Sequence, residues 1–142
     1  MSVRETALVA LHARLGAALA ARNPAPKVLR NETVPPRLPT GGLVVVRDGE
    51  TVEETAILSP LAWAVEHRAE VEVVAATGAL LDTLLVDIAA AIAGDRTLAG
   101  AVEWAQPGAP SFDDAETEGA AAARAASVPV TLSFTVAGSP LA

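Results

Sequence analysis

The stretch WAVEHRAEVEV, residues 63–73, alternates between two kinds of side chain. Glutamate or arginine occupies the even positions from 66 to 72, and tryptophan, valine, histidine or alanine occupies the odd positions. A period of two is typical of a β-strand with one face against a core and the other face exposed. At ~3.3 Å per residue the strand is about 35 Å long, roughly twice a usual strand. We therefore expect it to extend beyond a small core or to bend around one.

The same alternation bears on Glu66-His67-Arg68, which looks like a catalytic group when it is written as a line. Neighbours on a strand point to opposite faces, so we expect His67 to point toward the core, away from Glu66 and Arg68. We interpret His67 as a buried, neutral histidine with one hydrogen-bond partner.

The charged face has two interpretations. Glu66, Arg68, Glu70 and Glu72 project about 7 Å apart along one side of the strand. They form either a solvated face whose charges limit edge-to-edge association, or the lining of an assembly surface or channel.

Two amphipathic helices are predicted on either side of this region. The first begins at Ser2, which has capping-box spacing with Glu5, and ends near Arg22 before the segment Asn-Pro-Ala-Pro. The second covers about residues 79–93, with Thr77 as its N-cap and the glycine at 94 as its C-cap. Leucine and isoleucine recur at steps of three and four in both, which gives each helix an apolar face.

Shorter strands are predicted elsewhere. Asp48-Gly49 indicates a hairpin between strands at about 43–47 and 50–58, because both residues tolerate positive φ. Further strands are expected near 101–105 and at 128–136.

The order of elements favours a single α+β domain over residues 1–142. Adjacent strands indicate a mostly antiparallel sheet of about four or five strands, with the helices packed on one face. The proline- and glycine-rich segment 23–42 is a connector, either a binding arm or a surface crossing, and 106–120 is a loop.

Composition narrows the function. The chain has 142 residues, a net charge of −7 and no cysteine, which excludes disulfides and thiolate chemistry. It has no Gly-rich phosphate loop, no nucleophile elbow and no spaced set of metal ligands. Its longest apolar run is far short of a membrane span. We expect a soluble, cytoplasmically made protein with no cofactor, metal or catalytic residue, and its acidity argues against wrapping nucleic acid.

Four segments resemble one known family. They are VLRNETVPPRLPTGGLVVVRDGE (28–50), ILSPLAWAVEHRAEVEVV (57–74), LLVDIAAAIAGDRTLAGAVEWAQPGAP (84–110) and AASVPVTLSFTV (125–136). Together they resemble the tail terminator proteins, also called minor tail or tail completion proteins, of long-tailed bacteriophages and prophages.

The resemblance implies a structural role in the virion. A terminator forms a ring, commonly a hexamer, on the head-proximal end of the tail tube, where it stops polymerisation and joins the tube to the head connector. The implied partners are further copies of the chain, the tail tube protein and the head-completion protein. DNA only passes through the ring. The implied location is the virion tail, and the host cytoplasm during assembly.

Surface charge gives the candidate contact residues. We expect the ring interface or lumen to use Arg47, Asp48, Glu50, Glu66, Arg68, Glu70, Glu72, Asp95 and Arg96. The main alternative is another head–tail joining or completion protein of similar fold. Less favoured are a binding module unrelated to phages, and a small α+β enzyme or ligand-binding domain that uses Glu66, His67, Asp87 or Arg96.

Overall fold

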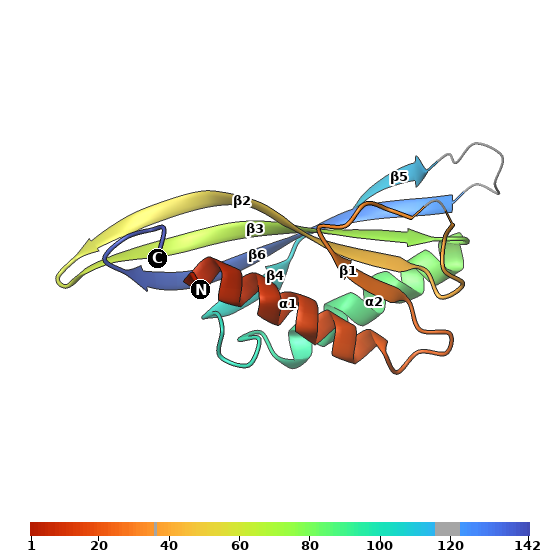
Figure 1. Ribbon diagram of the computed structural model, residues 1–142, viewed down its shortest axis with the longest axis horizontal. Helices are drawn as coiled ribbons and strands as arrows, with labels where there is room; N and C mark the ends of the chain where they lie inside the picture. Colours follow the sequence, from red (N-terminus) through yellow and green to blue (C-terminus); the bar gives the residue numbers. More distant parts are fainter. Residues whose placement is uncertain (36, 116–122) are drawn as a thin grey trace.

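The computed structural model describes residues 1–35, 37–115 and 123–142. It consists of one mixed β-sheet with two helices packed on one face (Figure 1). In these residues six strands form one sheet in the order β1-β2-β3-β6-β4, with β5 also paired to β6. The elements are α1 (Val3–Leu19), β1 (Lys27–Arg30), β2 (Leu43–Leu58), β3 (Leu61–Ala75), α2 (Gly78–Gly94), β4 (Trp104–Pro107), β5 (Ser111–Ala115) and β6 (Ala123–Ala137).

The α+β class is confirmed, but the expected sheet is wrong in size and direction. It has six strands in the described part of the chain, and it is mixed because β1 runs parallel to β2. β1 lies inside the 23–42 connector, and β5 lies inside the expected loop at 106–120, of which residues 116–120 are outside the described residues. Strands of four and five residues are too short for a period of two to separate them from loop.

The hairpin predicted at Asp48-Gly49 is also wrong. β2 is one strand of 16 residues, and the turn lies at Ser59-Pro60, where Leu58 pairs with Leu61. Asp48 and Gly49 instead form a bulge, because the register shifts between Arg47 and Glu50. Gly49 has positive φ in this bulge, as it would in a tight hairpin, so the dipeptide does not distinguish the two structures.

Both predicted N-caps are confirmed. The side chains of Ser2 and Thr77 accept hydrogen bonds from backbone N–H groups three residues further on. The other ends differ: α1 stops at Leu19, before the expected end, and Asp95 rather than the glycine at 94 is the C-cap of α2. β4 starts after most of the predicted 101–105 segment, and β6 is longer than the predicted 128–136.

The main core lies between the helices and one face of the sheet. The odd positions of β3 from Val65 to Val73 are buried there, while Glu66 and Arg68 are exposed, so the predicted alternation is confirmed. The leucine stripe of α1 is also buried. Burying one leucine contributes about 1.5–3 kcal/mol, against about 1 kcal/mol for a cap, so the stripe determines how the helix sits on the sheet.

A second, smaller core lies on the opposite face. Leu43, Val45 and Val74 are buried there, and Leu29 and Leu38 of the 23–42 connector pack against them. This explains why the run at 43–46 is buried on both faces. Of the two interpretations of the connector, the structure favours a crossing that covers the sheet.

The helices cover only part of the sheet. β3 has 15 residues and is about 50 Å long at ~3.3 Å each, whereas α1 has 17 residues and is about 25 Å long at ~1.5 Å each. Figure 1 shows the β2–β3 hairpin and the end of β6 extending past the start of α1. We call residues 50–66 of this hairpin the arm. The expectation that the long strand extends beyond the core is confirmed.

The bulge gives a first prediction. Gly49 has φ +66°, and a Cβ there would overlap the backbone carbonyl of Arg68. Gly100 has φ +86° but open space around it. Gly100→Ala should lower the free energy of unfolding by about 1–2 kcal/mol through the positive φ alone. Gly49→Ala should cost clearly more, because the clash is added. Urea unfolding measures both, and equal losses would show that the bulge relaxes freely.

Candidate functional site

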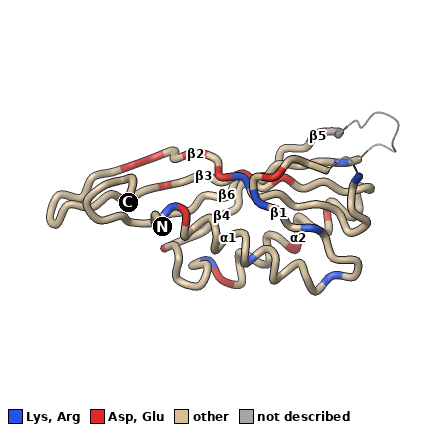
Figure 2. The backbone as a smooth tube through the Cα atoms, viewed as in Figure 1, with Lys and Arg blue, Asp and Glu red and all other residues tan. Residues whose placement is uncertain are grey.

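Six of the predicted contact residues share the sheet face opposite the helices, here called the outer face. Arg47 and Glu50 of β2 pair in register with Glu70 and Arg68 of β3, so their side chains lie on the same side. The set on this face is Arg47, Glu50, Glu66, Arg68, Glu70 and Glu72. Figure 2 shows charged residues along β2 and β3 in the arm and in the middle of the sheet.

Part of this face is neutralised by internal contacts. Arg47 Nε donates to Glu72 Oε2 at 2.8 Å, and Ser127 Oγ donates to Glu70 Oε2 at 2.9 Å. The side chains of Arg47 and Glu72 are 35% and 39% exposed, so this pair contributes at most about 1 kcal/mol. Nearer the arm, Glu50, Glu66 and Arg68 form no ion pair within the described residues.

The arm end of the outer face is acidic. Glu53 pairs directly opposite Glu66, and with Glu103 they line a shallow groove that includes Ser133. Thr135 Oγ1 donates to Glu103 Oε1 at 2.7 Å. Within the described residues, no three His, Asp or Glu side chains form a group that could hold a metal ion.

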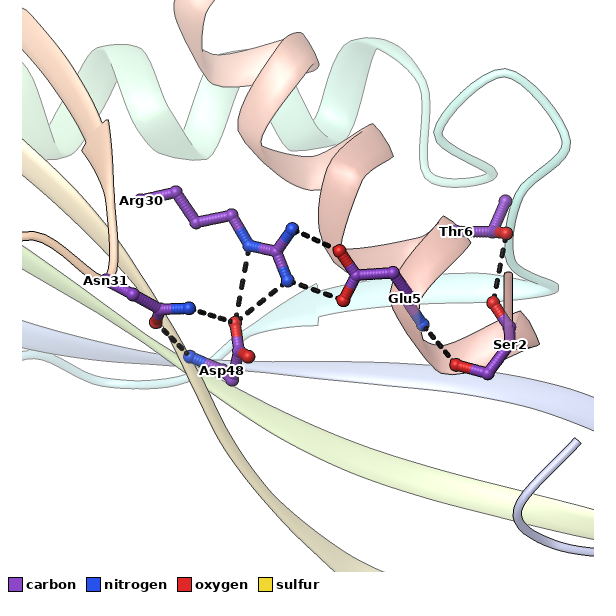
Figure 3. Close-up of polar contacts among 6 residues, drawn as sticks. All are labelled: Ser2, Glu5, Thr6, Arg30, Asn31 and Asp48. Atoms are coloured by element: carbon purple, nitrogen blue, oxygen red, sulfur yellow. Dashed lines mark hydrogen bonds and ion pairs between the residues drawn. The ribbon is translucent and has the colours of Figure 1, made fainter.

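Asp48 belongs to a different cluster, on the bulge (Figure 3). Arg30 donates two hydrogen bonds to the Glu5 carboxylate at 2.6 and 2.8 Å, and its Nη2 donates to Asp48 Oδ1 at 3.0 Å. Asn31 Nδ2 donates to the same Asp48 oxygen at 2.9 Å, and Asn31 Oδ1 accepts from the Asp48 backbone N–H. The cluster therefore joins the first turn of α1, the end of β1 and the bulge of β2.

The electrostatics of this cluster keep it ionised. The hydrogen bonds from Arg30 hold the pKa of Glu5 below its ordinary value. Burial works to raise the pKa of Asp48, but hydrogen bonds from Asn31 and Arg30 outweigh it and the net pKa is lowered. Both carboxylates raise the pKa of Arg30 further above its usual value. Each charge has a partner, so the cluster fits a structural joint.

His67 lies directly beneath the bulge and is buried. Its Nε2 contacts the Asp48 carbonyl, which can only accept, so Nε2 carries the hydrogen. Nδ1 then accepts from the Thr51 hydroxyl at 3.1 Å. Burial lowers the pKa of His67 and outweighs the opposing hydrogen bond to Asp48. The predicted burial of His67 is confirmed, and its lowered pKa favours the neutral form. It has two hydrogen-bond partners rather than the one expected, and no hydrogen bond joins it to Glu66 or Arg68 in the described residues.

Asp95 has a local role in the turn after α2. Its carboxylate accepts from the N–H and hydroxyl of Thr97 and from the N–H of Ala99. These hydrogen bonds lower the pKa of Asp95, and the one from the Thr97 side chain has the largest effect. Asp95 is thus used in shaping the turn.

Arg96 lies beside β4, toward the edge of the sheet opposite β2. Its Nη1 donates to the Ala105 carbonyl at 3.1 Å and to Gln106 Oε1 at 2.9 Å. Its guanidinium lies 4.9 Å from the centre of the Trp104 ring, a cation–π distance. Trp104 is 50% exposed, so Arg96 and Trp104 form a cationic, aromatic surface at this edge.

Asp87 pairs with Arg22, which lies just after α1. The hydrogen bond from Arg22 lowers the pKa of Asp87. A groove beside this pair is otherwise lined mainly by alanines: Ala18, Ala21, Ala90 and Ala91. Asp87 thus joins the two helices, and the groove offers mostly apolar surface.

The sequence did not predict that Glu5, Arg30 and Asn31 form a polar cluster around Asp48. It also did not predict that Trp104 is a surface residue. Arg30 and Asn31 lie in a segment dominated by proline, and their partners are far away in the sequence. The available signal for Trp104 was a tryptophan next to a glutamate inside the predicted strand 101–105.

Neither models of protein families nor curated proteins match the chain. Separately, no helix in the described part of the chain is long and apolar enough to cross a bilayer.

The Glu5–Arg30–Asp48 cluster predicts a specific acid sensitivity. Glu5 and Asp48 have folded-state pKa values below their ordinary 4.5 and 3.8. Their stabilisation is therefore present above about pH 5 and lost as the pH falls toward 3. Arg30→Gln should be less stable at pH 7 and should lose less stability on acidification. Urea unfolding across this range tests it. Arg37→Gln, an exposed arginine, is the control and should keep the wild-type slope; an unchanged slope in Arg30→Gln would contradict the prediction.

His67 predicts a second pH dependence, nearer neutrality. Its folded-state pKa lies below the ordinary 6.5, so the unfolded chain takes up the proton first and stability falls as the pH drops below about 6.5. His67→Gln should lower stability at pH 7.5 by about 1–3 kcal/mol, because buried partners are left unpaired. It should also show a smaller fall between about pH 7.5 and 5.5. His12→Gln is the control, and matching slopes in wild type and His67→Gln would refute the assignment.

Proposed function

We propose that this chain is a structural protein that forms a ring on the head-proximal end of a phage or prophage tail tube, stops tube polymerisation and joins the tube to the head. The observation that carries this proposal is the arm, a strand hairpin that extends past the helices. The resemblance of four sequence segments to the tail terminator family supports the same function.

The arm has surface that an isolated domain does not need. β1 covers β2 only from Leu43 to Val46, and beyond Glu50 no other segment of the described chain forms backbone hydrogen bonds with the free side of β2. Val52, Ile57, Leu58 and Leu61 are exposed on the same hairpin. An open strand edge with apolar side chains is a surface suited to association with another chain.

The outer face suits the inner wall of a ring. Its acidic end, with Glu66 and Glu103, would repel DNA and let it pass without binding. In this proposal the chain binds further copies of itself, the tail tube protein and the head-completion protein, and DNA only passes through. The ring is assembled in the host cytoplasm and remains at the head end of the virion tail.

Deleting the gene from the phage or prophage that carries it tests the function. Because the proposed ring stops tube growth, electron micrographs of the induced lysate should show tubes longer than the normal tail and without heads. Expression of the chain in trans should restore tail length. Tails of normal length that lack heads would indicate a head–tail joining protein instead. Normal, complete particles would refute both assignments.

A further inference from the structure

The sheet has two different open edges, the free part of β2 and the outer side of β4, and they lie at the same position along the strands. The register runs across four strands in two rows, Glu53–Glu66–Ser133–Trp104 and Glu50–Arg68–Thr131–Gln106. The free part of β2 therefore begins directly across the sheet from β4. Figure 1 shows β2 and β4 on opposite sides of β3 and β6.

The β2 edge is acidic. Glu50, Glu53 and Glu54 are exposed, and no ion pair to them is formed within the described residues. Between them Val52 is 41% exposed. Two such edges placed against each other would bring glutamates face to face, which is destabilising across strands. The β2 edge thus disfavours a symmetric contact with its own copy and suits a cationic partner.

The β4 edge has the complementary chemistry. Arg96 uses Nη1 for Ala105 and Gln106, which leaves Nε and Nη2 without a partner among the described residues. These two nitrogens form the fork that binds a carboxylate through two hydrogen bonds. The Trp104 ring lies against the guanidinium at a cation–π distance and helps to hold it in place.

Strand direction fits the same contact. β2, β3, β6 and β4 alternate in direction, since each neighbouring pair is antiparallel. A second copy placed with its β2 beside β4 continues this alternation. The contact joins two different surfaces, so it repeats head to tail, and it closes into a ring when the rotation between copies allows.

We propose that Arg96 and Trp104 of one copy bind Glu50 and Glu53 of the next, so that the acidic β2 edge of each subunit lies against the β4 edge of its neighbour. This contact rests on the proposed ring and identifies the surface between its subunits.

Crosslinking tests the contact, because the chain has no cysteine of its own. Val52→Cys and Gln106→Cys place thiols on the two edges without removing the four residues of the contact. Within one copy the two positions are three strand spacings, or about 14 Å, apart. A bismaleimide shorter than this separation should give the double variant a ladder of dimers, trimers and larger species. A mixture of the two single variants should stop at a dimer. Val86→Cys with Gln106→Cys, with the first thiol on the exposed face of α2, is the matched control and should give no ladder.

Two crosslinking results would overturn the proposal. A dimer from Val52→Cys alone would show that β2 edges meet each other. A failure of the double variant to exceed the control at any protein concentration would show that these edges do not meet.

A charge exchange then tests the named residues in the double-cysteine background. Arg96→Glu alone, or Glu50→Arg with Glu53→Arg, should reduce the ladder at least tenfold. All three changes together should restore it, which a merely misfolded variant would not do. Singles that leave the ladder unchanged would contradict the contact. Overlong tubes in the deletion strain without this ladder would refute the contact alone, whereas the ladder with normal particles would refute the tail function alone.

Discussion

The apolar face of β3 is the constraint on which the rest of the structure depends. β3 is paired with β2 and β6 along almost its whole length, so its backbone is satisfied on both sides. Its odd-numbered side chains must then be removed from water, and the leucine stripe of α1 and the apolar face of α2 do this. The helices are shorter than the strand, so the same pairing that stabilises the sheet also carries the arm beyond them.

The bulge at Asp48-Gly49 marks the point along β2 at which the strand stops being covered by other elements. On one side of Asp48 the strand is buried on both faces, and on the other side it is exposed. Glu5, Arg30 and Asn31 hold the side chain of Asp48, and His67, on the helix-facing side of the sheet, contacts the Asp48 carbonyl. Single exposed ion pairs contribute little to stability. Their value here is geometric, because together they fix the position at which the arm leaves the core.

Features that depend on neighbouring residues could be predicted from the sequence, whereas features that depend on distant segments could not. The alternation of residues 63–73, the two N-caps and the inward direction of His67 depend on neighbours in the sequence, and all are confirmed. β1 and β5 are strands because of partners elsewhere in the sheet, and no local pattern identifies them. Asp48-Gly49 satisfies bulge and hairpin alike, and only the pairing of Leu58 with Leu61 decides between them. Six candidate contact residues share one face: parity places the four on β3, and the bulge of β2 brings Arg47 and Glu50 onto the same side. Asp48 and the Asp95-Arg96 turn lie elsewhere, which parity along β3 does not reveal.

The order of the strands has a consequence for synthesis on the ribosome. β3 lies between β2, which precedes it, and β6, which follows only after α2, β4 and β5. A nascent chain that has made the hairpin therefore has a long unpaired β3 side until β6 emerges, and such unfinished edges are prone to wrong pairing. β4 also pairs with β6, so the Arg96–Trp104 surface cannot be in place earlier. A subunit with this topology acquires its sheet and its second edge in one late step.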